Sequence, residues 1–345
     1  MATLDDDLPQ ENVKSVFASL RVNDYKYLSI GLLGSAFALN MQLIAQGWMV
    51  YEMTSSAMKL TWVTLSFMIP QVVFSLLGGV LADRFAKKPI IGWAPFINGL
   101  ATLVMALIIF SGKADFSAFL VIGFLNGTVL ALSMPARTAF IPELVGEELI
   151  FNAMAFNSAC WNLARIVGPA AAGFIIAIFA EGNTTSGFGV GLVYVILSLL
   201  YFVSALSVLY ISHPGRPVQI QKKSALKDTQ EALRYVVNSP IVGGLILLSI
   251  LPFLFGLSIN TLLPAFSTDV LKGGPDDLGL LMTGMGFGAI IGSLALAKMS
   301  SFTKKGFWII GTGALWGGLV AIFSITKDYL ISTIVIGCIG FVSAI

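Results

Sequence analysis

Long apolar runs alternate with short polar segments along most of the chain. A membrane-spanning helix needs roughly 20 apolar residues to cross ~30 Å of hydrocarbon, and ten runs approach or exceed this length. They lie near residues 27–49, 61–82, 89–110, 117–139, 152–180, 188–211, 241–265, 278–299, 306–325 and 329–345. The pattern therefore predicts an all-α polytopic membrane protein with ten helices in this sequence.

The longest polar gap separates six of these runs from the remaining four. Moving the chain along itself by 213 residues places Gly31 on Gly244, Gly79 on Gly292 and Asp115 on Asp328, which supports two parallel six-helix repeats. The last run reaches Ile345 with no charged residue to end it, so we expect a second repeat truncated in its tenth helix. The predicted divisions are a cytoplasmic N-terminal segment (1–26), an N-terminal six-helix bundle (27–212), a cytoplasmic linker (213–239) and an incomplete C-terminal bundle (240–345).

Composition agrees with a membrane protein and excludes several other classes. The 345 residues are 57% hydrophobic and 11% charged, with a mean hydropathy of +0.88, whereas soluble domains carry about a quarter charged residues. A net charge of +2 predicts no nucleic-acid-binding face. Cys160 and Cys338 lie in apolar runs and are expected to be small buried side chains. The single histidine, His213, cannot form a histidine metal cluster. We expect no metal, no cofactor and no enzymatic activity.

Lysine and arginine positions predict the orientation. With the N-terminus inside, the inner segments collect most basic residues, and the outer segments hold only Lys59, Lys113, Lys272 and Lys327. This asymmetry follows the positive-inside rule. Arg165 is then the only basic residue assigned to the interior of a span.

One basic turn carries a recognisable motif. Residues 78–88 read Gly-Gly-Val-Leu-Ala-Asp-Arg-Phe-Ala-Lys-Lys and join the second and third runs, which we expect to be antiparallel neighbours with close contact at the glycines. The segment resembles the loop between helices 2 and 3 of the major facilitator superfamily, with Ala86 in place of a glycine and Lys87 in place of an arginine. The matching positions are Gly79, Leu81, Ala82, Asp83, Arg84, Lys87 and Lys88.

Three more segments are similar to the branch of that superfamily that holds enterobactin exporters and other bacterial drug and metabolite effluxers. They are residues 48–54, 135–145 and 162–169, and the similarity is strongest over residues 20–212. The resemblance implies a multi-pass transporter of the bacterial inner membrane that works by alternating access, commonly exporting its substrate as protons enter. We expect a monomer whose partners are the lipid bilayer, a small drug-like, siderophore or amphipathic substrate, and protons. An importer or lysophospholipid flippase of the same fold, or a non-transporting scaffold, remains the alternative.

Polar residues inside the spans are candidates for the substrate path. Gln42 and Gln46 share one helix face, and in the resembled fold they would meet Asn126 and Asn260. Arg165 lies at midspan, where a charge costs at least about 2.5–3.5 kcal/mol, so it should face a cavity together with polar neighbours. Asn157 and Asn162 are the neighbours expected in its sector. These amides would bind a polar ligand or hold helices together, and the sequence does not decide between the two roles.

Other residues are candidates for conformational change and coupling. Pro169, after Gly168, removes a helical hydrogen bond and predicts a kink in the fifth span. Glu52, near an outer end, is the candidate for proton coupling because no acidic residue occupies the middle of a span; its alternative role is an ordinary rim charge. The residues expected to form an inner gate are Gly79, Asp83, Arg84, Lys88, Arg137 and Glu143.

Overall fold

The computed structural model describes residues 17–179, 187–216, 261–298 and 305–343, with residues 234, 238, 239, 242–244 and 259 between them. The regular structure within these ranges is helical. After the short 3₁₀ helix η1 (Ala18–Arg21), the first half contains six long helices. They are α2 (Asn23–Thr54), α3 (Ala57–Arg84), α4 (Lys87–Phe110), α5 (Phe116–Val145), α6 (Ile150–Phe179) and α7 (Gly187–Leu209). A second 3₁₀ helix, η2 (Glu147–Leu149), precedes α6.

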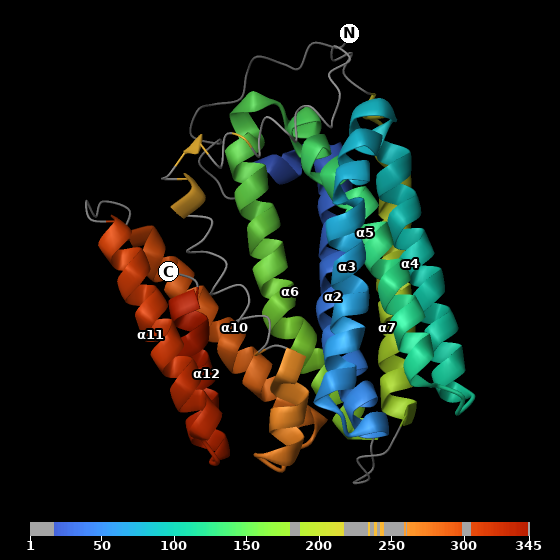
Figure 1. Ribbon diagram of the computed structural model, residues 1–345. Coiled ribbons are helices and arrows are strands. Elements are labelled where there is room, and N and C mark those ends of the chain that lie inside the picture. Colours follow the sequence, from blue (N-terminus) through green and yellow to red (C-terminus); the bar gives the residue numbers. More distant parts are fainter. Residues whose placement is uncertain are drawn as a thin grey trace.

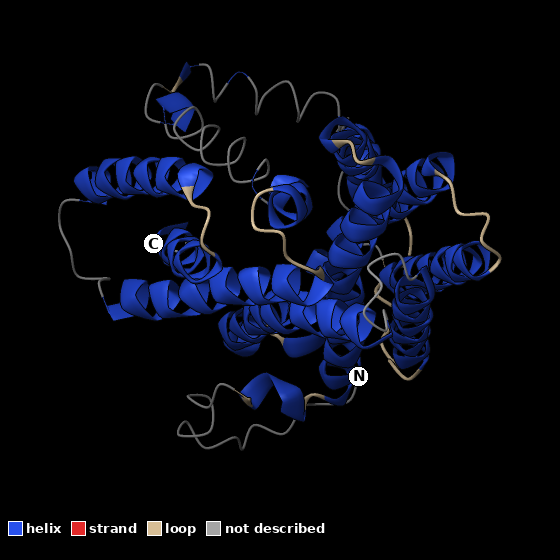
Figure 2. Ribbon diagram, turned by 90° about the horizontal axis from the view of Figure 1, so that it is seen from below, coloured by secondary structure: helices blue, strands red, loops and turns tan. Residues whose placement is uncertain are grey.

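The second half contains α10 (Pro275–Lys298), α11 (Lys305–Ile325) and α12 (Tyr329–Ser343). A helical segment at residues 261–269 precedes α10. The predicted spans other than the seventh correspond in order to α2–α7 and α10–α12. The seventh predicted span lies largely outside the described residues, as does most of the linker. Figures 1 and 2 show two groups of helices, with the C-terminus in the smaller group.

Short polar side chains start several of the helices. The Asp115 carboxylate accepts a hydrogen bond from the Ala118 backbone N–H at 2.9 Å and caps α5. The Ser117 hydroxyl donates to the same carboxylate at 2.7 Å. These bonds, led by the one from Ser117, lower the pKa of Asp115. Asp328 caps α12 in the same way, through the Ile331 N–H at 3.0 Å. These caps stabilise the turns that precede α5 and α12.

Glycines bring α3 and α5 into close contact. A Cβ atom at Gly78 would overlap the backbone of Ala131, and one at Gly127 would overlap the backbone of Phe67. Gly79, by contrast, faces open space. The close contact expected at these glycines was with the third span, α4; Gly78 instead contacts α5, and Gly79 contacts neither, so the expectation is wrong for both residues.

The helices α3 and α4 are not the packed neighbours that their short connection predicts. Instead, α3 packs mainly on α5, whereas α4 packs mainly on α7. The connection is short, but the glycine contacts described above place α5 against α3. The prediction of antiparallel direction holds, and the prediction of direct packing is wrong.

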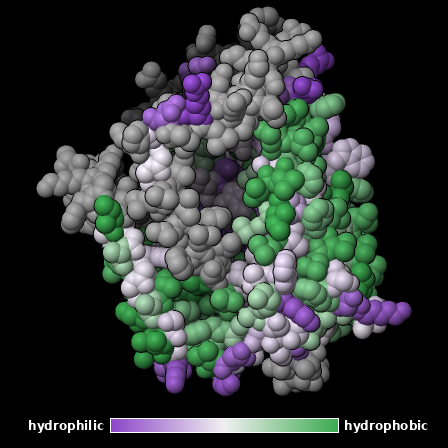
Figure 3. Space-filling model, in the orientation of Figure 1, coloured by the Kyte–Doolittle hydropathy of each residue, from purple (hydrophilic) through white to green (hydrophobic). Residues whose placement is uncertain are grey.

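Six helices, α2 to α7, are long and apolar enough to cross a membrane among the described residues. Their outward faces carry many exposed large apolar side chains, such as Val72, Leu107 and Val121. Apolar surface covers much of the face shown in Figure 3. This is the surface expected of helices that contact lipid acyl chains. The chain is therefore a polytopic membrane protein.

Candidate functional site

The two groups of helices meet where α6 of the first half packs on α10 of the second. We call the end at which α2 begins the N-terminal side and the opposite end the far side. A Cβ atom added to Gly279 of α10 would lie 3.3 Å from the Pro169 carbonyl oxygen and 3.4 Å from the Gly173 Cα atom of α6. Figure 1 shows α6 and α10 converging toward the far side and separating toward the N-terminal side. The small residues allow this close crossing, so the far side is closed at α6 and α10.

A hydrogen bond joins the two halves at the same end. The Tyr51 hydroxyl of α2 donates to the carboxylate of Asp269, the last residue of the helical segment 261–269. Nearby, a Cβ atom at Gly47 would lie 3.1 Å from the Pro264 side chain. The far side is therefore held by a polar contact as well as by close helix packing.

We expect Tyr51→Phe to favour opening of the far side. A hydrogen bond to a charged group contributes about 1.5–3 kcal/mol, so its loss should move the equilibrium between closed and open far sides by about tenfold or more. The measurement is the distance distribution between spin labels at Lys59→Cys and Lys327→Cys, in a background with Cys160 and Cys338 replaced by serine.

Tyr329→Phe is the matched control for this experiment. The Tyr329 hydroxyl donates to the Asp277 carbonyl at 3.1 Å, and both residues belong to the second half. Its loss should leave the distance between the labels unchanged. If the Tyr51→Phe variant gave the same spin-label distance distribution as the parent, the hydrogen bond from Tyr51 to Asp269 would not hold the far side closed.

Arg165 lies on the face of α6 that points to the space between the halves. Residues seven and eleven positions apart share a helix face, and Ala172 and Ile176, at these spacings from Arg165, are buried at the closed end. The opposite face carries exposed apolar residues, namely Leu163, Val167, Phe174 and Ile178. Arg165 itself is exposed. It therefore faces the opening that begins where the α6–α10 contact ends.

The polar neighbours predicted for Arg165 lie on the same helix, α6. Asn157 and Asn162 are half-buried, and the Asn157 Oδ1 atom is buried with no hydrogen-bond partner among the described residues. The space-filling view shows a hollow over α6 with hydrophilic surface in its depth (Figure 3). A buried carbonyl oxygen without a partner is costly, so this position is suited to a donor from water or ligand.

The amides of α2 and α5 form a connected chain. The Asn126 side chain donates to Gln42 Oε1 at 3.3 Å, and the Gln42 amide donates to Gln46 Oε1 at 3.3 Å. Gln42 and Asn126 are buried, whereas Gln46 is half-buried. The structure thus brings these three predicted residues together. Asn260, the fourth, lies outside the described residues.

Beside these hydrogen-bonded amides is a small polar cavity, the chamber, of about 20 Å³. It is lined by residues that include Ser35, Asn98, Asn126, Arg137 and Tyr201. A chamber of this volume holds about one water molecule. The oxygen atoms Oδ1 of Asn98 and Asn126 and the Nε atom of Arg137 are buried there without partners in the described residues. The chamber is therefore too small for a drug-like substrate.

The residues expected to form one gate are separated in the structure. Glu143 forms an ion pair with Lys87 at 2.7 Å, whereas Arg137 is buried and its Nη2 atom lies 3.5 Å from the Ser35 hydroxyl. Arg137 and Glu143 are not brought together in this conformation, because α5 continues through Pro142 as one helix. Six residues along a helix turn through about 240°, which places the two side chains on different faces.

The other expected gate residues lie near the start of α4. Asp83 and Arg84 are exposed, and neither forms an ion pair with a described residue. Lys88 instead donates to the Leu209 and Ile211 carbonyls at 3.3 and 2.5 Å. Lys88 therefore holds the end of α7 in this conformation.

Gly168 and Pro169 lie where α6 packs on α2 of its own half and on α10 of the second half. A Cβ atom at Gly168 would lie 3.1 Å from the Asn40 Cβ atom of α2. The Pro169 carbonyl oxygen lies on the side of Gly279 of α10, as described above. Although Pro169 removes one helical N–H, α6 continues without a break from Ile150 to Phe179. The pair thus permits close packing to α2 and α10 at the same level.

Glu52 lies near the far end of α2. It is half-buried, and its Oε2 atom is buried with no hydrogen-bond partner among the described residues. The Trp48 indole nitrogen, one turn earlier, is also buried and unpaired. An unpaired buried carboxylate oxygen is unfavourable when it is charged, which makes this position suited to binding a proton.

Two features of this site had no signal in the sequence. Tyr51 and Asp269 are 218 positions apart. Ser35 and Ser204, whose hydroxyls lie 2.8 Å apart beside Arg137, are separated by 169 positions. Serine and tyrosine are common in apolar helices, so their residue types alone do not distinguish paired from unpaired positions. Only the packing of α2 against α7 and the second half brings them together.

Two halves of apolar helices that pack on each other are the architecture of a membrane transporter of the major facilitator class. The sequence pattern of the transmembrane secretion effector family within that class matches residues 14–343. The chain belongs to this family, whose members are transporters and not enzymes.

Among known proteins, the chain is similar to siderophore transporters. It is 25% identical over 322 residues to the enterobactin exporter EntS of Citrobacter koseri, with 92% of this chain and 71% of the relative covered. It is 25% identical over 269 residues to the staphyloferrin A transporter of Staphylococcus aureus, with 75% of this chain and 63% of that protein covered.

Solved structures show the same fold. A bacterial homologue of the lysosomal transporter Spinster, in an inward-facing and occupied conformation, superposes with a TM-score of 0.65 at 17% identity, covering 94% of this chain and 74% of that chain. The nucleoside transporter NupG superposes with a TM-score of 0.67 at 15% identity, covering 93% and 80%. At these identities the comparison establishes the architecture and not the substrate.

Proposed function

We propose that this protein is a secondary active exporter of a siderophore, drug-like molecule or other amphipathic metabolite. It moves the substrate across the bacterial inner membrane by alternating access, in exchange for protons. The observation that carries the proposal is the position of Arg165, which is exposed on the face of α6 that packs on α10 further along the helix. A central charge that faces an opening between helices is typical of a substrate pathway.

The proposed direction of transport depends on the orientation of the protein in the membrane. Lys87, Lys88 and Arg216 lie together at the N-terminal side, because the Lys87 N–H donates to the Gly215 carbonyl at 2.9 Å. The positive-inside rule places this side in the cytoplasm. The open side then receives substrate from the cytoplasm, and the far side, closed at Tyr51 and at the α6–α10 crossing, must open to release it.

The polar groups of the pathway favour a ligand rich in oxygen atoms. Arg165 presents five N–H donors in a planar fork that suits carboxylates and other oxygen pairs. The water-sized chamber beside Asn126 excludes substrate from the interior of the first half. The substrate is therefore expected to bind between the halves, with Arg165, Asn162 and the half-buried Gln46 in contact with it. The names of the siderophore-transporting relatives support the same substrate class.

Efflux measurements test the proposal directly. Cells that express the protein from its own gene should extrude at least one member of a panel of dyes, antibiotics and catecholate siderophores, and a protonophore should stop that efflux. Uptake in place of efflux would indicate an importer, and translocation of lysophospholipid would indicate a flippase. No flux of any kind from protein shown to be folded in the membrane would favour a scaffold.

Glu52→Gln should uncouple efflux from the proton gradient. The change keeps the shape of the side chain but removes the protonation site, so we expect pH-driven efflux to fall by about tenfold or more while exchange of substrate down its own gradient continues. The measurement is transport in proteoliposomes with an imposed pH gradient. Asp115→Asn is the control, because it removes an exposed charge on the same side and keeps the helix cap. Full pH-driven transport by Glu52→Gln would reject Glu52 as the coupling group.

A further inference from the structure

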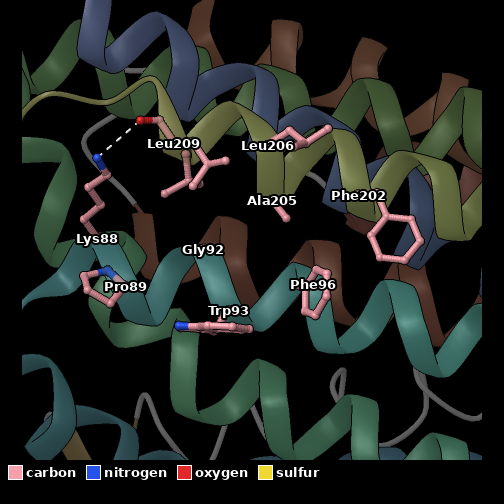
Figure 4. A pocket seen from close by; sticks show the side chains of 10 residues that line it. Lys88, Pro89, Gly92, Trp93, Phe96, Phe202, Ala205, Leu206 and Leu209 are labelled. Carbon is pink, nitrogen blue, oxygen red and sulfur yellow. Dashed lines mark hydrogen bonds between the residues drawn. The ribbon is translucent and has the colours of Figure 1, made fainter.

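An apolar groove of about 580 Å³ runs between α4 and α7 on the outside of the first half. Gly92 and Ala205 are among its smallest lining residues, and Trp93, Phe96 and Phe202 contribute rings to it (Figure 4). The rings contact one another, with centroid distances of 5.5 Å for Trp93–Phe96 and 5.8 Å for Phe96–Phe202. The groove is therefore built by aromatic side chains around a stretch of small residues.

The groove opens to the surroundings of the protein and not to the path between the halves. Trp93 is 63% exposed and Leu206 is 56% exposed. The helices that form it pack on α2, α5 and α6 of the same half. Because these helices cross the membrane, the medium outside them is lipid. An apolar groove in that position is suited to an acyl chain.

One end of the groove is cationic. The Lys88 ammonium group donates to two carbonyls at the end of α7, which leaves one of its three N–H donors available. No carboxylate pairs with Lys88 in the part of the chain that the structure describes, because Glu143 is paired with the adjacent Lys87. Arg216 is exposed and follows Gly215, whose carbonyl accepts from the Lys87 N–H. Two cations are thus available at this end.

The carboxylate of Asp24, which contacts the segment after α7, is already engaged. The two oxygens of Asp24 accept from the backbone N–H groups of Ser212 and His213 at 2.9 and 2.8 Å. Lys88 is the only charged residue among those that line the groove, and the exposed Asp83, five residues earlier, does not line it. A phosphate at this end would therefore find Lys88, with Arg216 close by in the chain. Trp93 lies five residues from Lys88, about 7.5 Å along the helix, where an indole ring suits the boundary between headgroups and acyl chains.

We propose that this groove binds an anionic phospholipid of the bilayer. One acyl chain lies between α4 and α7 against Phe96 and Phe202, and the phosphate contacts Lys88 and Arg216. Because Lys88 also holds the end of α7, the bound lipid would stabilise the packing of α4 on α7. The site is separate from the substrate path, so it does not depend on the proposed export function.

The test measures lipid retained by the purified protein, by native mass spectrometry after exchange into nanodiscs of phosphatidylglycerol or phosphatidylcholine. We expect the parent protein to retain phosphatidylglycerol in preference. Removing one of the two cations, in Lys88→Gln or Arg216→Gln, should lower that retention by about fivefold. Ala205→Phe should lower retention of both lipids because it fills the groove and leaves the cations in place. Lys113→Gln, on an exposed lysine at the other end of α4, is the control and should change nothing.

Several results would overturn the proposal. They are equal retention of the two lipids by the parent, unchanged retention in the folded Ala205→Phe and Arg216→Gln variants, or displacement of the bound species by excess inorganic phosphate, which would indicate a simple anion site. Arg216→Gln keeps the test decisive if Lys88→Gln fails to fold, because no hydrogen bond of Arg216 holds α7 among the described residues. Lipid retention needs no transport, so its failure would leave the export proposal untouched.

Discussion

Replacement of Arg165 by lysine is expected to lower efflux by about tenfold to a hundredfold. Lysine keeps the positive charge but loses the planar fork of donors, and each hydrogen bond to a charged ligand group contributes about 1.5–3 kcal/mol, where 1.4 kcal/mol corresponds to a factor of ten. The measurement is the initial rate of efflux as a function of internal substrate concentration, in cells with matched levels of protein in the membrane.

The control for this experiment comes from the same helix. Val167 is 42% exposed on the opposite, lipid-facing side of α6, so Val167→Ala should leave efflux close to the parent rate. Arg165→Ala should reduce efflux further than Arg165→Lys, because it removes the charge as well as the fork. Efflux by Arg165→Lys close to the parent rate would contradict recognition of the substrate by several donors of this side chain.

Glu143→Gln is expected to destabilise the first half by about 3 kcal/mol, because it leaves Lys87 buried without its partner. Lys87 is the more buried member of the pair, with its side chain 5% exposed against 23% for Glu143. The measurement is the free energy of unfolding in detergent. Since α4 and α5 both belong to the first half, the pair should affect stability more than the equilibrium between the open and closed conformations.

The double variant Lys87→Met with Glu143→Leu supplies the comparison. It removes both charges, so no unpaired charge is buried, and it should recover most of the stability lost by the single change. The opposite result would be an unchanged free energy of unfolding together with altered spin-label distances in Glu143→Gln. The Lys87–Glu143 pair would then control the conformational equilibrium and would not stabilise the first half.

The membrane spans could be predicted from the sequence because lipid imposes a simple rule on every segment. Each backbone polar group must be satisfied within the helix, so a run of apolar residues of the right length is sufficient to identify a span. The connected amides Gln42, Gln46 and Asn126 could be anticipated for a related reason. Burying a polar side chain among apolar helices costs free energy unless it is hydrogen-bonded, so such side chains tend to form hydrogen bonds with one another.

Partners across helices could not be predicted in the same way. Glu143 has Arg137 nearby in sequence, but its partner is Lys87 on another helix. Gly78 and Gly79 are adjacent, yet only Gly78 faces α5. Successive residues of a helix point about 100° apart, so the rotation of the helix about its own axis decides which of them faces a neighbour. That rotation depends on all the helices that pack around it.

The sequence by itself therefore determined that this protein is a helical membrane transporter, since composition and motif order are local properties of the chain. Only the tertiary structure decided which end of the path is closed, that Arg165 faces the opening, and that Lys88 stands at the end of a groove facing lipid. These are relations between helices distant in the chain, and close packing of side chains selects them.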